Sequence, residues 1–217
     1  MSTPFIVEII TLIPETWPHL IASSTGVVGR AFAKGLLELR VRDLRAYGQG
    51  PHKHVDDAPY GGGAGMVLMA DPLVRAIEDA RKATPGPVLM LAPRGDMFVQ
   101  STAQGLSEGE GVVLVCGRYE GVDERVYSYV DGCLCIGEYV LSAGDPAAWC
   151  VIDAIARLRP GVLGNSASLE GESFGEHGRR GPPQYTRPMD FRGEKVPDVL
   201  RSGDHAAIAA WRARGGC

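Results

Sequence analysis

Three glycine-rich stretches stand out as places where the backbone of this chain could approach a ligand closely. They span residues 60–66 (YGGGAGM), 117–121 (GRYEG) and 136–144 (IGEYVLSAG). Glycine has no side chain and readily adopts positive φ, and the second and third stretches follow apolar runs that are typical of strands. Open α/β sheets bind ligands beyond the carboxyl ends of their strands, so these two stretches predict a ligand pocket. Tight turns without a ligand remain an alternative interpretation of each stretch taken alone.

The same stretches lack the signatures of the common nucleotide-binding loops. None ends in the Gly-Lys-Ser/Thr of a P-loop, and no GxGxxG follows the first expected strand, which argues against NAD binding by a dinucleotide fold. An enzyme that binds nucleotide phosphates through residues 61–65 is a further hypothesis. This loop has no Lys or metal-binding Asp beside it in phosphate-binding spacing.

The elements that would position these stretches alternate between strand-like and helix-like segments. Apolar runs typical of strands occupy residues 5–12, 37–41, 88–91, 112–116 and 133–136, and helix-compatible segments follow most of them. This alternation predicts an α/β domain with a mainly parallel sheet.

Helices are expected at three places within this domain. Residues 73–82 carry an apolar face, with Asp71 as the N-cap and Pro72 at the first helical position. Residues 123–129 predict a second helix, and residues 146–157 predict a third helix with a buried apolar stripe.

The composition changes after this domain. We expect residues 1–163 to form the α/β domain and residues 164–184, rich in Gly, Ser, Glu and Arg, to form a flexible linker. Residues 185–217 predict a small helical segment, in which residues 202–204 cap a short helix that runs through Trp211. About 30 residues cannot hold a hydrophobic core alone, so we expect this segment to pack on the first domain or on a partner subunit.

Composition limits the class of protein. With 45% apolar residues the chain is expected to be globular, and its longest apolar runs are far shorter than the roughly 20 residues of a membrane-spanning helix. The first residues carry Glu8 inside an apolar run and no basic segment, so they predict a strand and a cytoplasmic location rather than a signal peptide. The five cysteines form an odd set typical of reduced thiols, and no zinc-finger spacing accompanies them.

The formal net charge of −4 argues against nucleic-acid binding through a positive field of the whole protein. Local basic patches are compatible with this charge, although solvated surface charge is the alternative for each residue alone. The candidates are Arg40, Arg42, Arg45, His52, Lys53, His54, Arg157, Arg159, Arg179, Arg180, Arg187 and Arg192.

Five motifs together are more specific than any of their parts. They are VDDAPYGGGAGMV, GRYEGVDERV, IGEYVLSAGD, RPGVLGN and PPQYTRP, in this order along the chain. In this combination the sequence resembles the TrmD family, the tRNA (guanine-N1) methyltransferases of the SPOUT class, over residues 6–212. The resemblance implies transfer of a methyl group from S-adenosylmethionine to N1 of guanosine 37 in tRNA. A catalytically impaired relative that binds RNA or S-adenosylmethionine is the alternative.

By this resemblance, the last part of the α/β domain forms a deep trefoil knot that holds the methyl donor. The resemblance also implies a homodimer with active sites at the subunit interface, and assistance by Mg²⁺, for which the sequence contains no recognisable ligand cluster. The residues that correspond to the family's donor site are Leu91, Pro93, Gly117, Ile136, Gly137, Glu138, Tyr139, Val140, Leu141 and Gly144.

The reaction requires a group that removes the proton from N1 of guanine and a cation that stabilises the charge developing on O6. By resemblance, Glu172 is the base, Arg157 is the cation, and Glu120 holds the amino edge of the target base. N1 faces the pairing partner inside a helix, so the target base must lie in a loop or be flipped out. The residues that would shape the guanine site are Arg118, Tyr119 and Ser173.

The sequence departs from the family pattern in three places. The family's base is usually the aspartate of an Asp-Ser-Phe triplet, whereas residues 172–174 read Glu-Ser-Phe, with Glu170 as a weaker candidate. A misplacement of about 1 Å can lower a rate on the order of 10²-fold, so the longer glutamate requires the loop to shift. Asp145 stands where the family usually has the glutamate of Gly-Gly-Glu. The chain also ends soon after Trp211, earlier than the family generally does, so we expect a weaker or smaller grip on tRNA.

Overall fold

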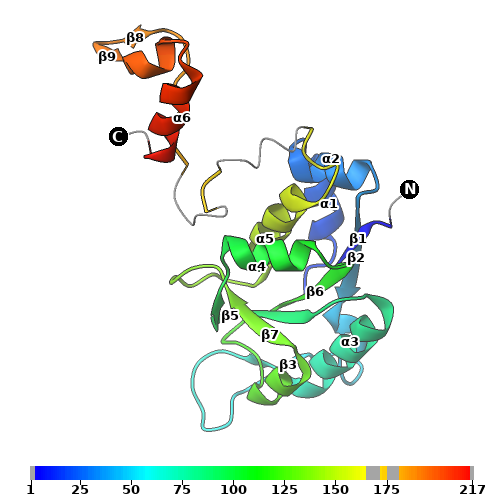
Figure 1. The fold of residues 1–217 in the computed structure, drawn as a ribbon. Helices are drawn as coiled ribbons and strands as arrows, with labels where there is room; N and C mark the ends of the chain where they lie inside the picture. The colour runs from blue at the N-terminus through cyan, green and yellow to red at the C-terminus, as the bar shows by residue number, and fades with distance from the viewer. Residues whose placement is uncertain (1–2, 165–171, 175–180, 216–217) are drawn as a thin grey trace. The chain divides into compact units, whose positions relative to one another are not determined.

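The computed structural model describes residues 3–164, 172–174 and 181–215. The chain forms two compact units, Met1–Gly164 and Asn165–Cys217. The main strands of the first unit are β1 Phe5–Thr11, β2 Leu37–Asp43, β5 Val88–Met97, β6 Gly111–Cys116 and β7 Gly132–Cys135. They form one sheet in the order β2-β1-β6-β5-β7, in which every pairing is parallel (Figure 1).

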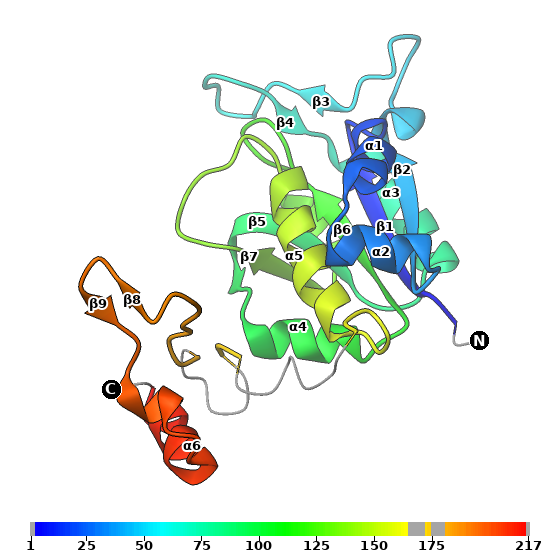
Figure 2. The same cartoon turned by 90° about the horizontal axis from the view of Figure 1, so that it is seen from above.

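Helices cover both faces of this sheet (Figure 2). They are α1 Thr16–Ser23, α2 Val27–Ala33, η1 Leu44–Tyr47, α3 Ala70–Ala83, α4 Gln100–Ser107, η2 Glu124–Tyr129 and α5 Asp145–Leu158. On one face, α1, α2, α4 and α5 pack on a core that includes Trp17, Val28 and Ile152. On the other face, α3 and the 3₁₀ helices η1 and η2 pack on a core that includes Leu73 and Val126. This burial of both faces confirms the predicted α/β fold with a parallel sheet.

The predicted strands lie within two residues of the observed ones, except at the end of β5. The prediction stops at Leu91, whereas β5 continues to Met97 after a shift in register between Leu91 and Asp96. The side chains of residues 92–97 are partly or fully exposed, so this part of the strand carries no apolar run. Its pairing with β7 is a tertiary contact that hydrophobic periodicity does not indicate.

The prediction that Asp71 caps the helix after it is wrong. α3 begins at Ala70, with Met69 at the N-cap, so Asp71 lies in the first turn. Its carboxylate accepts hydrogen bonds from Arg75 Nε at 3.2 Å and from Gln49 Nε2 at 3.1 Å. Asp71 therefore stabilises the helix start through charge and through contacts with the preceding loop.

Other helices agree with the prediction in place but not always in type. η2 is a 3₁₀ helix, and Asp123 caps it by accepting a hydrogen bond from the backbone N–H of Arg125. α5 lies within one residue of its predicted bounds at each end. The sequence patterns do not indicate α1, α2 or α4, nor the two-residue strands β3 Asp56–Asp57 and β4 Val67–Leu68.

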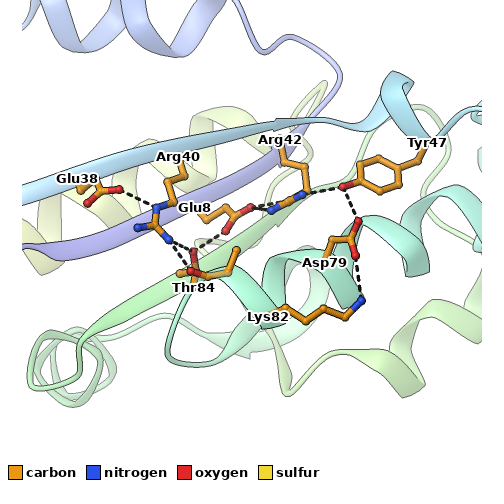
Figure 3. A network of polar contacts seen from close by, with 9 residues as sticks. Glu8, Glu38, Arg40, Arg42, Tyr47, Asp79, Lys82 and Thr84 are labelled. Atoms are coloured by element: carbon orange, nitrogen blue, oxygen red, sulfur yellow. Dashed lines mark hydrogen bonds and ion pairs between the residues drawn. The ribbon is translucent and has the colours of Figure 1, made fainter.

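A buried carboxylate in β1 holds four elements together (Figure 3). Glu8 is 1% exposed and therefore needs hydrogen-bond partners. Arg42 Nε on β2 donates to Glu8 Oε1 at 2.6 Å, and Thr84 Oγ1 after α3 donates to Glu8 Oε2 at 2.5 Å. Arg42 Nη1 also donates to the hydroxyl of Tyr47 at 2.7 Å, and that hydroxyl donates to Asp79 on α3 at 3.2 Å. These contacts connect β1, β2, η1 and α3.

Two further residues of the expected basic patches, Arg40 and Arg159, also make contacts within the first unit. Arg40 on β2 forms an ion pair with Glu38 at 2.7 Å. Arg159 donates to the carbonyl of Ser107, and its guanidinium lies 5.0 Å from the ring centroid of Phe5. Both side chains therefore have partners within the first unit.

The second unit contains a small hairpin, a 3₁₀ helix and the helix α6 (His205–Ala213). The carboxylate of Asp204 accepts hydrogen bonds from two N–H groups of the first turn, at 3.0 Å each, which confirms the predicted cap. Trp211 is 7% exposed, and its ring centroid lies 6.3 Å from that of Tyr185. The hairpin of the second unit consists of β8 Asp190–Phe191 and β9 Glu194–Lys195, and its 3₁₀ helix is η4 Asp198–Arg201.

No helix in the described parts of the chain is long and apolar enough to cross a membrane.

Candidate functional site

A cavity of about 480 Å³ opens at the carboxyl ends of β5, β6 and β7. Its walls come from the middle of β5 (residues 90–94), the loop after β6 and the loop between β7 and α5. Ligand pockets of open α/β sheets lie at this edge, where the glycine-rich stretches predict one. Nine of the residues that correspond to the family's donor site line the cavity. They are Leu91, Pro93, Gly117, Ile136, Gly137, Tyr139, Val140, Leu141 and Gly144.

A close backbone contact joins two of these walls. The N–H of Gly144 donates to the carbonyl of Gly117 at 2.8 Å, and Ala143 pairs with Arg118 in an isolated antiparallel bridge. A Cβ atom at position 144 would lie 2.8 Å from Cα of Cys116, which is closer than real Cβ atoms come to backbone. Glycine is therefore required at position 144 for the loop before α5 to reach the end of β6.

The loop before α5 also exposes three apolar side chains. Tyr139, Val140 and Leu141 are 56%, 89% and 38% exposed, although they line a cavity. Neighbouring apolar side chains with this exposure are typical of a surface that a ligand or a partner covers. Glu138, which corresponds to the same donor site, is exposed and is not among the lining residues.

The loop after β6 forms a polar wall of the cavity. Arg118, Tyr119 and Glu120, the residues expected around the guanine, all line it. Tyr119 has a φ of 60°, in the left-handed region that residues other than glycine rarely adopt. Such a backbone costs energy and persists only where the surrounding structure holds it, which is common in functional loops.

The first glycine-rich stretch supports this polar wall. The N–H of Glu120 donates to the carbonyl of Met66 at 3.0 Å, and the N–H of Leu68 donates to the carbonyl of Gly121 at 3.0 Å. Gly65 has a φ of +84°, and a Cβ atom there would lie 2.4 Å from Cγ of Glu120. The structure therefore brings the first and second glycine-rich stretches together, although they are far apart in the sequence.

Sequence reasoning misses a second polar group at the cavity. Arg94, in the second half of β5, lies 4.4 Å from the ring centroid of Tyr127 and forms an ion pair with Glu124. The hydrogen bond to Glu124 raises the pKa of Arg94, and burial raises the pKa of Tyr127. The tertiary pairing of β5 with β7 brings Arg94 to this place, so no local sequence signal could have indicated it.

Arg157, the residue expected to stabilise the developing charge, does not line the cavity. Arg157 lies in the last turn of α5, whereas the first turn of the same helix adjoins the cavity. Glu172 and Ser173 belong to the second unit. Glu170, the weaker candidate for the base, lies outside the described residues.

The fold and the cavity define a class of α/β proteins that bind a small molecule at the carboxyl ends of neighbouring parallel strands, here beside a polar wall. Within that class, residues 5–215 match the family model described as tRNA (Guanine-1)-methyltransferase TrmD. The match spans nearly the whole chain, and the chain belongs to this family. The resemblance seen in the five motifs is thereby confirmed.

Individual relatives give the same result. The chain is 54% identical over 214 residues to the tRNA (guanine-N(1)-)-methyltransferase of Myxococcus xanthus, covering 98% of this chain and 85% of the relative. It is 45% identical over 205 residues to the protein of the same name from Persephonella marina, covering 94% and 80%. Among solved structures, it is similar to the tRNA (m1G37) methyltransferase from Aquifex aeolicus, with a TM-score of 0.75 and 37% identity. That match covers 96% of this chain and 87% of the Aquifex aeolicus chain.

Proposed function

We propose that this chain transfers the methyl group of S-adenosylmethionine to N1 of guanosine 37 in tRNA. One observation carries the proposal: the segments that correspond to the family's donor site and the wall that contains Glu120 line a single cavity. The names of the relatives describe the same modification of guanine, and the Aquifex aeolicus protein is described as an m1G37 methyltransferase.

The cavity suits the methyl donor in size and in chemistry. Its volume of about 480 Å³ lies within the roughly 300–1,000 Å³ of small-molecule sites. Leu91, Ile136 and Leu141 offer apolar contacts to an adenine ring, and the glycines around them leave backbone groups accessible to it. S-adenosylmethionine, when bound, supplies an activated methyl group. The protein then has to orient two reactants and to handle one proton.

Glu120 is the residue that recognises the guanine. Its carboxylate accepts hydrogen bonds from the amino edge of the base, and hydrogen bonds to a charged acceptor are stronger than neutral ones. Arg118 and Tyr119, directly before Glu120 in the sequence, shape the site, and the surrounding structure holds Tyr119 in its left-handed backbone conformation. The base must be unpaired to present N1, as it is in an anticodon loop.

Arg157 and Glu172 complete the reaction from a second copy of the chain, which makes the active form a homodimer with sites at the subunit interface. Twelve residues separate Arg157 from Asp145, an axial distance of about 18 Å along α5 at 1.5 Å per residue. That distance exceeds the length of an arginine side chain, so Arg157 of the same chain does not reach the first turn of α5, which adjoins the cavity. The exposed apolar residues 139–141 suit contact with a partner. Glu172 then removes the N1 proton, while Arg157 stabilises the charge on O6.

The donor site lies in the part of the chain for which the family resemblance predicts a trefoil knot. The segment after β7 returns to the end of β6, where Gly144 bonds to Gly117, before α5 packs against α2 and β1. A chain that passes through the loop after β6 at this point would form the trefoil knot, so we include the knot in the proposal.

The partners in this proposal are tRNA, the methyl donor and a second copy of the chain, and tRNA as substrate places the protein in the cytoplasm. Within the described residues, no three His, Cys, Asp or Glu side chains group together as metal ligands. Mg²⁺, which the family resemblance implies, is given no site in this proposal.

Methyl transfer from labelled S-adenosylmethionine to a tRNA with guanosine 37, compared with the same tRNA carrying adenosine 37, tests the proposal. We expect labelling of the first tRNA only, and m1G at position 37 after nuclease digestion. Donor binding measured in parallel separates the alternatives. Binding without turnover would favour the catalytically impaired relative, and absence of binding would refute the donor site itself.

We expect Gly65→Ala to lower methyl transfer on the order of 10²-fold without changing donor affinity. The added methyl group would lie 2.4 Å from Cγ of Glu120 and would push that side chain out of the guanine site. Gly61→Ala is the matched control, because Gly61 has a similar φ of +86° but no atom within 4 Å of the added Cβ. Equal losses in both variants would show that backbone strain, rather than displacement of Glu120, causes the effect.

A further inference from the structure

Asp145, the first residue of α5, connects three segments that are remote in sequence. Its Oδ1 atom accepts a hydrogen bond from Thr11 Oγ1 at 2.7 Å and another from Trp17 Nε1 at 2.9 Å. Thr11 ends β1, and Trp17 is a buried residue of α1. One carboxylate oxygen therefore fixes the start of α5 against the end of the first strand and against the helix that follows it.

The same carboxylate interacts with the end of β6. The thiol of Cys116 is buried, and burial raises its pKa well above the ordinary value, with a further increase from the neighbouring Asp145 carboxylate. The thiol thus remains protonated and can donate to the carboxylate. Asp145 adjoins the ends of two neighbouring strands, β1 and β6, from behind the cavity.

The segments that Asp145 fixes are those that form the donor side of the cavity. Gly144, directly before it, donates to the carbonyl of Gly117, directly after Cys116. Ala147, in the same helical turn, lines the cavity, but Asp145 itself does not. The carboxylate therefore acts from outside the cavity on the contact between Gly144 and Gly117.

We propose that Asp145 is a positioning residue that sets the affinity for the methyl donor by holding Gly144 and Gly117 together from behind the cavity. This inference rests on the proposed function, since it concerns the donor side of the same site. Asp145 contacts neither the reacting atoms nor the guanine wall. Its loss therefore weakens donor binding and leaves the rate at saturating donor nearly unchanged.

The expected effects follow from the hydrogen bonds that each variant removes. Asp145→Ala removes all of them, and because bonds to a charged acceptor are strong we expect the Kd and the KM for S-adenosylmethionine to rise about 100-fold. Asp145→Asn keeps one neutral acceptor and should raise both values about 10-fold. Thr11→Val keeps a similar volume but removes the hydroxyl that donates to Asp145 and accepts from the N–H of Ile13, and it should raise both values about 3-fold.

Asp131→Asn is a matched control for loss of a bridging carboxylate. Asp131 accepts hydrogen bonds from both terminal nitrogens of Arg81 on α3 at 2.9 Å and from the N–H of Val88 on β5 at 2.7 Å. It lies at the amino ends of β5 and β7, away from the cavity. We expect this variant to lower the melting temperature while leaving the Kd for the donor within about twofold.

The experiment measures donor Kd by calorimetry, and kcat and KM for donor with saturating tRNA, for the full-length chain and each variant. A rise in Kd and KM with kcat within about threefold supports the proposal. A fall in kcat at unchanged KM, or wild-type Kd in folded Asp145→Asn and Thr11→Val, would overturn it. Thr11→Val keeps the test decisive if Asp145→Ala does not fold. Wild-type protein that neither binds donor nor methylates tRNA would instead refute the proposed function.

Discussion

We expect methyl transfer to guanosine 37 to fall about 10²- to 10⁴-fold when Glu172 is replaced by glutamine, because glutamine keeps the length of the side chain but cannot accept the N1 proton. Donor affinity is expected to stay unchanged, since glutamine keeps the length of the side chain and Glu172 is not one of the residues that correspond to the family's donor site. Single-turnover rates and equilibrium binding of labelled S-adenosylmethionine measure the two quantities separately.

Two variants make this result specific to Glu172. Glu172→Asp restores the residue type that the family usually has and is expected to keep or raise the rate, because the carboxylate remains available as a base. Glu170→Gln is expected to have little effect. A large loss in Glu170→Gln with a near-normal rate in Glu172→Gln would move the role of the base to Glu170.

Arg157→Ala is expected to lower kcat about 10²- to 10³-fold, the usual effect of removing one group that stabilises a developing oxyanion. The KM for S-adenosylmethionine should change little, because Arg157 does not line the donor cavity. Arg157→Lys should recover part of the rate, since the charge remains while the planar, two-pronged donor geometry is lost. Steady-state kinetics with both substrates varied give these values.

Mixed dimers test which subunit supplies Arg157. Gly144→Ala is expected to abolish donor binding, because the added Cβ would collide with the backbone of Cys116. Gly144→Ala and Arg157→Ala, the two variants to be mixed, are therefore each inactive alone. In a mixture, a dimer with one copy of each has one intact site if Arg157 acts on the partner's cavity, and about a quarter of the wild-type activity should return. No recovery in a mixture that forms mixed dimers would show that Arg157 acts within its own chain.

Local signals in the sequence predict much of the fold. The apolar runs of β1, β2, β6 and β7 and the stripe of α5 determine these elements, because their side chains must be buried wherever the chain folds. The Asp204 cap is equally local, since its carboxylate needs only the N–H groups of the next turn. Asp71 is the counterexample: a helix can begin earlier than its best capping residue when the preceding loop offers that carboxylate other partners.

The geometry of the candidate site is only partly accessible in this way. The motifs identify which residues gather at the cavity, but they do not indicate that Gly65 contacts Glu120 or that Asp145 contacts Thr11 and Trp17. These contacts join residues remote in sequence, and they depend on the strand order rather than on any local preference. Arg94 reaches the cavity for the same reason, through the exposed second half of β5.

The charged strand at the edge of the sheet has a consequence for synthesis of the chain. β2 is one of the two edge strands of the sheet, and its free backbone groups could pair with a strand of another molecule. Glu38, Arg40 and Arg42 occupy alternate positions along it, and charges on an edge strand oppose aggregation. β1 emerges from the ribosome long before β6, its other neighbour, so its second edge stays open while the chain grows. Glu8 places a charge in this otherwise apolar strand, and a charge within an apolar strand opposes aggregation while that edge is open.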